Sequence, residues 1–191
     1  NVRTSSDESS RIGFAKKAEI GDEGLKHISH LMKLEELSLG DTHISDAGLK
    51  HLSSLVNLQK LYLHNTNING DGLKHLTRLT NLYSLTLNGS QVNDDGLRHL
   101  NRLTFLHFLE LKDTEITDEG LKHVSRVKTL TELYLDGTRI SDEGLNYLRQ
   151  MPNLYRLSVS DTVVTDSGLK RFQEALPSCN IELDGSPYFV N

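Results

Sequence analysis

The sequence predicts an elongated α/β solenoid in which short strands and short helices alternate and the strands stack into one parallel sheet. The main observation is a glycine that recurs every 24 residues, always followed by a leucine. A fixed period between 20 and 50 residues is typical of solenoids. A strand-like spacing of leucines and a recurring helix start point to the same fold. The glycines are Gly24, Gly48, Gly72, Gly96, Gly120, Gly144 and Gly168.

The strands are predicted from the shared pattern L-x-x-L-x-L-x-x-T-x-I, as in LHFLELKDTEI from Leu106. Leucines two residues apart, such as Leu61 and Leu63, point to the same side of a strand. We therefore expect the leucines to face a core and the residues between them to face outward. Six such units begin at Leu34, Leu58, Leu82, Leu106, Leu130 and Leu154.

The helices are predicted from a second spacing and from their caps. Leu49, Leu52 and Leu55 are three residues apart, which indicates one stripe of a short helix. A favoured N-cap residue such as Thr117 precedes each helix, and an aspartate such as Asp118 usually follows it, where a carboxylate complements the helix dipole. We expect that aspartate to pair with the base four residues later. The threonine column is expected to hydrogen-bond backbone carbonyls of adjacent units.

One strand and one short helix per unit cannot bury their apolar faces alone, so the units must stack. Helices are wider than the spacing of paired strands, which predicts a curved, right-handed solenoid with the sheet on its concave face and the helices on its convex face. We expect about seven repeats with degenerate caps over residues 11–184. Residues 1–10 are expected to be a disordered tail or linker, and residues 185–191 a C-terminal tail.

The repeated residues resemble those of the leucine-rich-repeat family. L-x-x-L-x-L in six consecutive units and the continuation T-x-I-[ST]-D-x-G-L are similar to a 24-residue class of bacterial leucine-rich-repeat proteins. The repeats of F-box substrate receptors are also similar, but they run slightly longer and carry cysteine where this chain has Thr114 and its equivalents. The resemblance implies a horseshoe that binds another macromolecule, usually a protein, and it implies no catalytic residue.

Composition narrows the function further. A net charge of −5 and a pI near 6.0 argue against nucleic acid as a partner. No apolar run approaches the roughly 18 residues that a membrane span needs. Cys179 is the only cysteine, so neither an intrachain disulfide nor a thiolate metal cluster is expected. No motif predicts a catalytic residue, a metal site or a cofactor. The compartment stays open, with the cytoplasm slightly favoured over a secreted or surface location.

Histidine and lysine columns recur on the predicted helices, as His123 and Lys122 illustrate. We interpret both as exposed helix positions. Neighbouring helices lie too far apart for aligned histidines to share one metal ion, and the aspartates four residues before the lysines neutralise an anion-binding ridge. A weaker hypothesis is that histidine protonation makes partner binding depend on pH.

The candidate site is the outward-facing side of the strands. Its residue columns do not repeat, whereas the framework does, so these positions are free to carry function. Strand alternation exposes aromatic side chains there, together with mixed charges that we expect to be neighbours across adjacent strands, as in protein interfaces. The predicted partner-binding residues are Tyr62, His64, Phe108, Glu110, Lys112, Tyr134, Asp136 and Arg156.

The predicted function is protein–protein interaction without chemistry, by a monomer that binds a protein partner on its concave face. Two alternatives remain at this point. The chain could be a structural or adhesion segment of a larger surface protein. It could also be the substrate-recognition part of a ubiquitin ligase or a bacterial effector.

Overall fold

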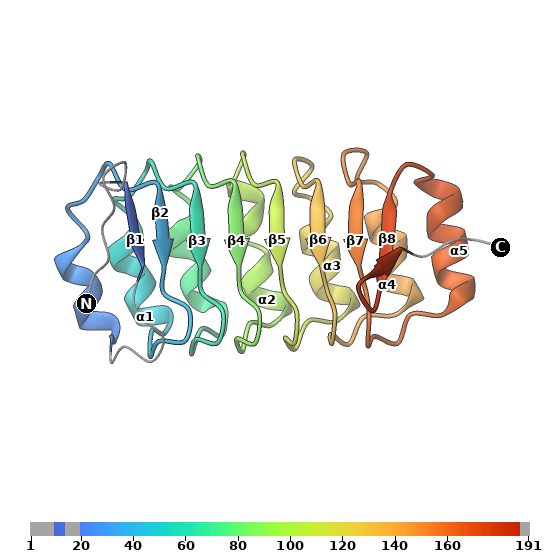
Figure 1. Cartoon of the computed structure of the whole chain (residues 1–191), viewed down its shortest axis with the longest axis horizontal. Helices are drawn as coiled ribbons and strands as arrows, with labels where there is room; N and C mark the ends of the chain where they lie inside the picture. Colours follow the sequence, from blue (N-terminus) through green and yellow to red (C-terminus); the bar gives the residue numbers. More distant parts are fainter. Residues whose placement is uncertain (1–9, 14–19, 188–191) are drawn as a thin grey trace.

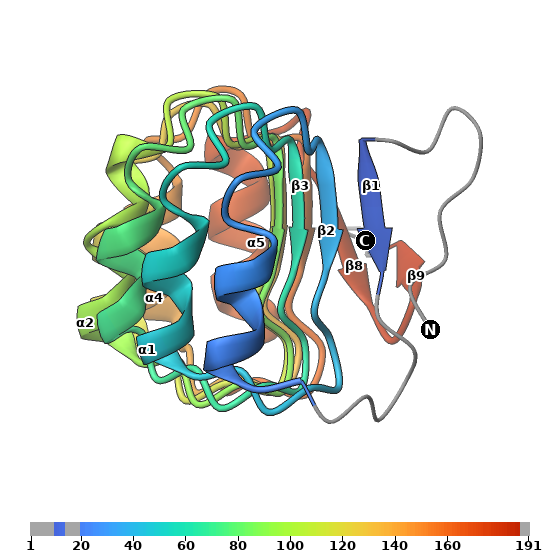
Figure 2. The same ribbon diagram turned by 90° about the vertical axis from the view of Figure 1, so that its left-hand side faces the viewer.

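The computed structural model describes residues 10–13 and 20–187. Nearly all of the predicted N-terminal tail lies outside these ranges. The described part forms two layers, a continuous sheet and a row of short helices behind it (Figures 1 and 2). The sheet contains nine strands in sequence order. They are β1 (Arg11–Gly13), β2 (Glu36–Ser38), β3 (Lys60–Tyr62), β4 (Ser84–Thr86), β5 (Phe108–Glu110), β6 (Glu132–Tyr134), β7 (Arg156–Ser158), β8 (Asn180–Leu183) and β9 (Ser186–Pro187).

Strand pairing confirms the predicted stacking. Strands β1 to β8 are parallel, and each residue pairs with the one 24 positions later from β2 through β8. Leu37, Leu61 and Leu85 therefore stack in one line, and the outward-facing residues form straight columns across the sheet. The fold is a right-handed α/β solenoid with the parallel sheet on its concave face, as predicted.

The helices are one to three turns long, and several are 3₁₀ rather than α-helical. The predicted caps are confirmed; for example, the Thr117 hydroxyl accepts a hydrogen bond from Glu119 N at 3.3 Å. The helical segments are η1 (Asp22–His27), α1 (Asp46–Leu49), η2 (Lys50–Leu52), η3 (Asp71–Leu76), α2 (Asp94–Leu97), η4 (Leu100–Arg102), α3 (Asp118–Val124), α4 (Asp142–Leu148) and α5 (Asp166–Ala175).

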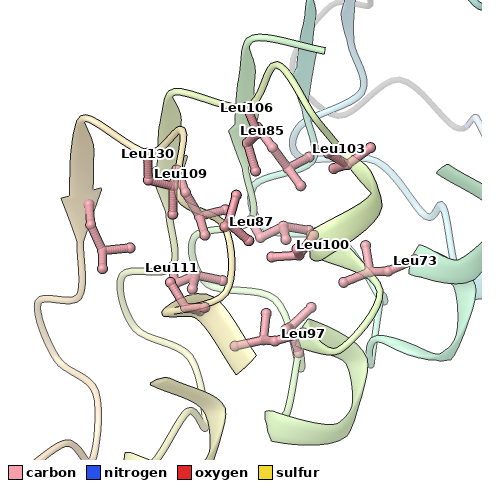
Figure 3. Close-up of a cluster of buried hydrophobic side chains, with 14 of the residues drawn as sticks. Leu73, Leu85, Leu87, Leu97, Leu100, Leu103, Leu106, Leu109, Leu111 and Leu130 are labelled. Atoms are coloured by element: carbon pink, nitrogen blue, oxygen red, sulfur yellow. The ribbon is translucent and has the colours of Figure 1, made fainter. Parts of the chain in front are cut away.

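The core is a leucine column shared by the two layers. Leu85 and Leu87 point from β4 and the turn after it toward Leu97 and Leu100 on the helical side (Figure 3). All four are 0% or 1% exposed. Each unit contributes apolar side chains at equivalent positions, so the apolar interior runs without a break along the solenoid.

The threonine column is structural, but its bonds differ from the prediction. Thr114 Oγ1 donates to Leu111 O at 2.6 Å, three residues earlier in the same unit rather than in a neighbour. Thr42, Thr66, Ser90, Thr138 and Thr162 make the equivalent bond. The hydroxyl closes the turn after each strand because the chain bends back toward its own carbonyl there.

Contacts between units come instead from the aspartates at the helix starts. Asp118 Oδ1 accepts from Ser141 N at 2.8 Å, and its Oδ2 accepts from the Ser141 hydroxyl at 2.6 Å. This replaces the expected pairing of Asp118 with Lys122, which instead forms an ion pair with Glu119 at 3.5 Å. The same aspartate-to-cap bridge joins Asp22 to Ser45, Asp46 to Asn69, Asp94 to Thr117 and Asp142 to Thr165.

The aspartate bridges also explain the recurring glycine. A Cβ on Gly120 would overlap Asp94 Oδ1, and a Cβ on Gly144 would overlap Asp118 Oδ1. The bridge is missing where the aspartate position is Gly70, whose φ of 115° is in the left-handed region. There Asn93 N donates to the backbone oxygen of Asn69 at 3.2 Å.

The C-terminal end of the sheet is closed by a short hairpin. Strand β9 lies within the predicted tail, yet it runs antiparallel to β8, with Leu183 opposite Ser186. Asp184 N donates to the Ser160 hydroxyl at 2.6 Å and ties the hairpin to the preceding unit.

Candidate functional site

The eight predicted residues lie on one surface, which we call the sheet face: the outward-facing side of β2 to β7 and the turn positions directly after those strands. Tyr62, Phe108 and Tyr134 project from β3, β5 and β6. The rings of Phe108 and Tyr134 are 5.2 Å apart at a tilt of 44°, so the structure brings these two together. Tyr62 lies two strands from Phe108, on the other side of β4.

Glu132 is the centre of a hydrogen-bonded cluster on β6 and β7. Its Oε2 accepts from the Tyr134 hydroxyl at 2.7 Å, and its Oε1 accepts from the Tyr155 hydroxyl at 2.7 Å. Arg156 Nη1 donates to Glu132 Oε2 at 3.2 Å, and Arg156 Nε lies 3.3 Å from Glu182 Oε1. The predicted neighbourhood of Glu132 and Arg156 is confirmed.

The electrostatics of the cluster follow from these bonds. Burial alone would raise the pKa of Glu132, but hydrogen bonds from Tyr134 and Tyr155 and the charge of Arg156 outweigh it and lower the pKa. Burial raises the pKa of Tyr134 to about 12, with Glu132 adding to the rise and Arg156 opposing it. Both groups therefore keep their ordinary neutral-pH charge over a wider pH range than usual.

A second charged pair adjoins the cluster. Lys112 Nζ lies 2.8 Å from Asp136 Oδ2 and 4.9 Å from the centre of the Tyr134 ring. Asp136 Oδ1 accepts from the Ser158 hydroxyl and from Ser160 N. Burial raises the pKa of Asp136, but Lys112 and the Ser158 and Ser160 donors lower it more. The predicted contact between Lys112 and Asp136 is confirmed.

Glu110 and His64 belong to a different part of the sheet face. Glu110 Oε2 accepts from Asn88 Nδ2 at 2.8 Å. His64 Nε2 lies 3.8 Å from Asp41 Oδ2, and its ring covers Gly40, where any side chain would overlap it. Neither residue is hydrogen-bonded to the Glu132 cluster in the part of the chain that the structure describes, although Glu110 lies opposite Tyr134 across the strands.

Between these regions the sheet face is hollowed over β4. The hollow has a volume of about 460 Å³ and is open to solvent. Its floor is formed by Ser84 and Thr86, the small residues of β4, because the flanking positions on β3 and β5 carry long side chains. Tyr62 and Phe108 are among the residues that form its walls.

A second group of aromatic side chains was not predicted. The rings of Tyr83 and His107 stack at 5.1 Å, and Phe105 meets His107 edge-on at 4.9 Å. Tyr83, Phe105 and Tyr155 are 39%, 52% and 47% exposed. Tyr83, His107 and Tyr155 form one column directly before the strands, so the 24-residue register was a usable signal for them.

The helical side of the solenoid has weaker candidates for a functional site. Four histidines of the helical column are half-buried rather than fully exposed: His51, His75, His99 and His123. In the described ranges, no three histidine, cysteine, aspartate or glutamate side chains gather closely enough to hold a metal ion. No helix there has the length and apolar character required to cross a membrane.

Comparison with known proteins agrees with this architecture. A family model described as "Leucine Rich repeat" matches residues 30–53, 102–125 and 128–148. These segments fall in the 24-residue register of the strands and helices. Over these segments the chain is similar to leucine-rich-repeat proteins. A search of curated proteins found no match.

Solved bacterial leucine-rich-repeat structures share this fold. An internalin C2 from Listeria monocytogenes is 23% identical, with a TM-score of 0.66 over 91% of this chain and 80% of that one. A second Listeria internalin is 19% identical, with a TM-score of 0.68 over 98% and 58%. A leucine-rich-repeat protein of Leptospira interrogans is 21% identical, with a TM-score of 0.63 over 82% and 45%. The chain thus spans about half the length of the latter two. Such folds are typical of protein-interaction modules.

Proposed function

We propose that this protein recognises a protein partner through its sheet face and carries out no chemistry of its own. The observation that carries the proposal is the aromatic and charged surface centred on Phe108 and Tyr134, with rings 5.2 Å apart. Aromatic side chains and arginine are the residues that most often dominate the binding energy of protein interfaces. Here Arg156 lies directly beside them.

Preorganisation supports this assignment. The Tyr134 hydroxyl and the Arg156 guanidinium are both held by Glu132, so neither side chain has to lose much freedom on binding. The framework positions beneath them are leucines that repeat in every unit. The surface can therefore change its side chains without changing the fold, which suits recognition.

Affinity capture tests the proposal directly. A variant with Tyr62, Phe108 and Tyr134 all changed to alanine is compared with wild type and with a matched helix-side variant, Lys74→Ala, Arg98→Ala and Lys122→Ala. We expect the sheet-face variant to lose captured protein partners while the helix-side variant keeps them, with both still folded by circular dichroism. Equal capture by wild type and the sheet-face variant would refute the site.

A further inference from the structure

The hollow over β4 has features that the interface proposal alone does not explain. Its floor residues, Ser84 and Thr86, are only 7% and 6% exposed. Within the described residues, neither side-chain hydroxyl has a hydrogen-bond partner, although both line the hollow. Both hydroxyls face the open hollow, so they are available to hydrogen-bond a polar group that enters it.

The walls of the hollow carry two charges without counter-ions. Lys60 on β3 is half-buried and forms no ion pair in the part of the chain that the structure describes. Glu110 on β5 accepts an amide hydrogen bond from Asn88, yet no cation lies within ion-pair distance of it among the described residues. Lys60 and Glu110 also do not pair with each other. They project from strands two places apart, about 10 Å at the usual strand spacing.

The other charges of the sheet face contrast with these two. Glu36 is paired with Arg11, Asp136 with Lys112, and Glu132 with Arg156. Both uncompensated charges therefore flank the one strand whose outward positions are small.

The strand register sets the two charges on different rows. Lys60, Ser84 and Phe108 occupy one row across the sheet, and Tyr62, Thr86 and Glu110 occupy the next. Rows two residues apart along a strand are about 7 Å apart. Tyr62 shares the row of Glu110, and its pKa is raised by burial first, then by Glu36 in the other row and by Glu110, against the opposing charge of Arg11.

We propose that the hollow receives two neighbouring side chains of a protein partner, a basic one that pairs with Glu110 and an acidic one that pairs with Lys60. This inference rests on the proposed function and names the chemistry of its partner. The basic side chain lies between the rings of Tyr62 and Phe108, where a cation is also attracted to aromatic faces. The hydroxyls of Ser84 and Thr86 complete the hydrogen bonding of the two charged groups.

The test uses four short peptides as probes: acetyl-Arg-Ala-Glu-amide and its versions with the arginine, the glutamate or both changed to glutamine. Binding at millimolar peptide is followed by the amide NMR shifts of Ser84 and Thr86. Glu110→Gln is expected to weaken the arginine peptides about two- to fivefold and to leave the Gln-Ala-Glu peptide unchanged. Lys60→Gln is expected to weaken only the glutamate peptides.

The matched control is Thr86→Tyr, which fills the hollow. Tyr62 and Tyr134 occupy the same position in other units, so the framework accepts this side chain. We expect Thr86→Tyr to fold normally and to abolish the shifts. Absence of shifts in wild type, or peptide binding that survives Thr86→Tyr, would overturn the inference.

The failure of this inference is distinguishable from failure of the proposed function. Protein capture that needs Phe108 and Tyr134, without any peptide bound over β4, would overturn only the inference. Peptide binding over β4 beside unchanged capture by the triple-alanine variant would overturn the proposed function instead.

Discussion

Arg156 and Glu132 face each other across neighbouring strands, with Arg156 Nη1 3.2 Å from Glu132 Oε2. The same carboxylate also accepts the hydroxyls of Tyr134 and Tyr155. A single half-buried acid therefore fixes the orientation of three side chains on the sheet face. This arrangement stabilises the fold and also holds the contact surface in a preformed geometry. It also makes the stability of the protein depend on the ionisation of Glu132.

Stability is expected to fall in acid partly through Glu132. Its folded-state pKa is lowered, so its contribution is present above the ordinary carboxylate pKa and is lost as the pH falls through the folded value. At pH 7 we expect Glu132→Gln to cost about 1–2 kcal/mol, because three hydrogen bonds lose their charged acceptor. Urea unfolding from pH 7 to pH 2.5 should show this gap closing below about pH 4. A gap that stays constant would contradict the assignment.

Tyr134 is expected to ionise late. Its pKa of about 12 reflects burial first; the hydrogen bond with Arg156 lowers the pKa, and the neighbouring Glu132 carboxylate raises it. NMR of ring-labelled tyrosine across pH 8 to 12.5 should show a late-titrating ring whose signal disappears in Tyr134→Phe, beside the rings of Tyr62 and Tyr155, whose pKa values are also raised. The charge-removing variant Glu132→Gln should shift that titration toward lower pH. Titration of Tyr134 near pH 10 would show that the cluster is not formed in solution.

The aspartate bridge between units predicts that replacing an aspartate by alanine lowers stability by an amount that depends on its position. Asp118→Ala removes two hydrogen bonds to Ser141 and is expected to destabilise the protein by about 1–3 kcal/mol. Asp166→Ala is the matched control, since Asp166 has the same place in its helix but, in the described ranges, no following helix cap to bind. It should cost no more than about 0.5 kcal/mol. Equal costs in thermal unfolding would assign the effect to the helix dipole instead.

The repeated glycine predicts a substitution effect opposite to helix propensity. Gly→Ala inside a helix ordinarily stabilises by about 1 kcal/mol. Gly120→Ala should destabilise, because its Cβ would overlap Asp94 Oδ1. Gly24→Ala, whose Cβ would have only Ile20 Cγ2 nearby, at 3.3 Å, should be about neutral. Denaturant midpoints of the two variants compare the positions, and a stabilised Gly120→Ala would disprove the close-approach explanation.

The repeat made the fold and the columns of the sheet face predictable. Once Leu61 and Leu63 were placed inward, the period of 24 residues determined which side chains are neighbours, including Lys112 beside Asp136. Sequence rules predicted hydrogen-bond partners less well where several groups could bind the same carboxylate. The position of Asp118 fits the helix dipole, a base four residues later and the cap of the next unit. Only three-dimensional geometry shows that the Ser141 cap is the partner.

The missing counter-ions of Lys60 and Glu110 were also beyond sequence reasoning. A column shows which side chains are adjacent, but not which of them reach each other. The aromatic group of Tyr83, Phe105 and His107 was missed for another reason. The predicted site comprised outward positions within and just after the strands, whereas these side chains precede the strands and contact one another there.

The claim that the sheet face binds the partner is tested most directly by titrating the captured protein partner into two matched variants. Phe108 occupies a position that carries glutamate, lysine or arginine in other units, so Phe108→Ala should leave the melting temperature nearly unchanged. The account predicts that Phe108→Ala raises Kd at least about tenfold, while the helix-side variant Lys122→Ala changes it less than about twofold. A larger rise in Kd for Lys122→Ala than for Phe108→Ala would place the interface on the helical side and contradict the account.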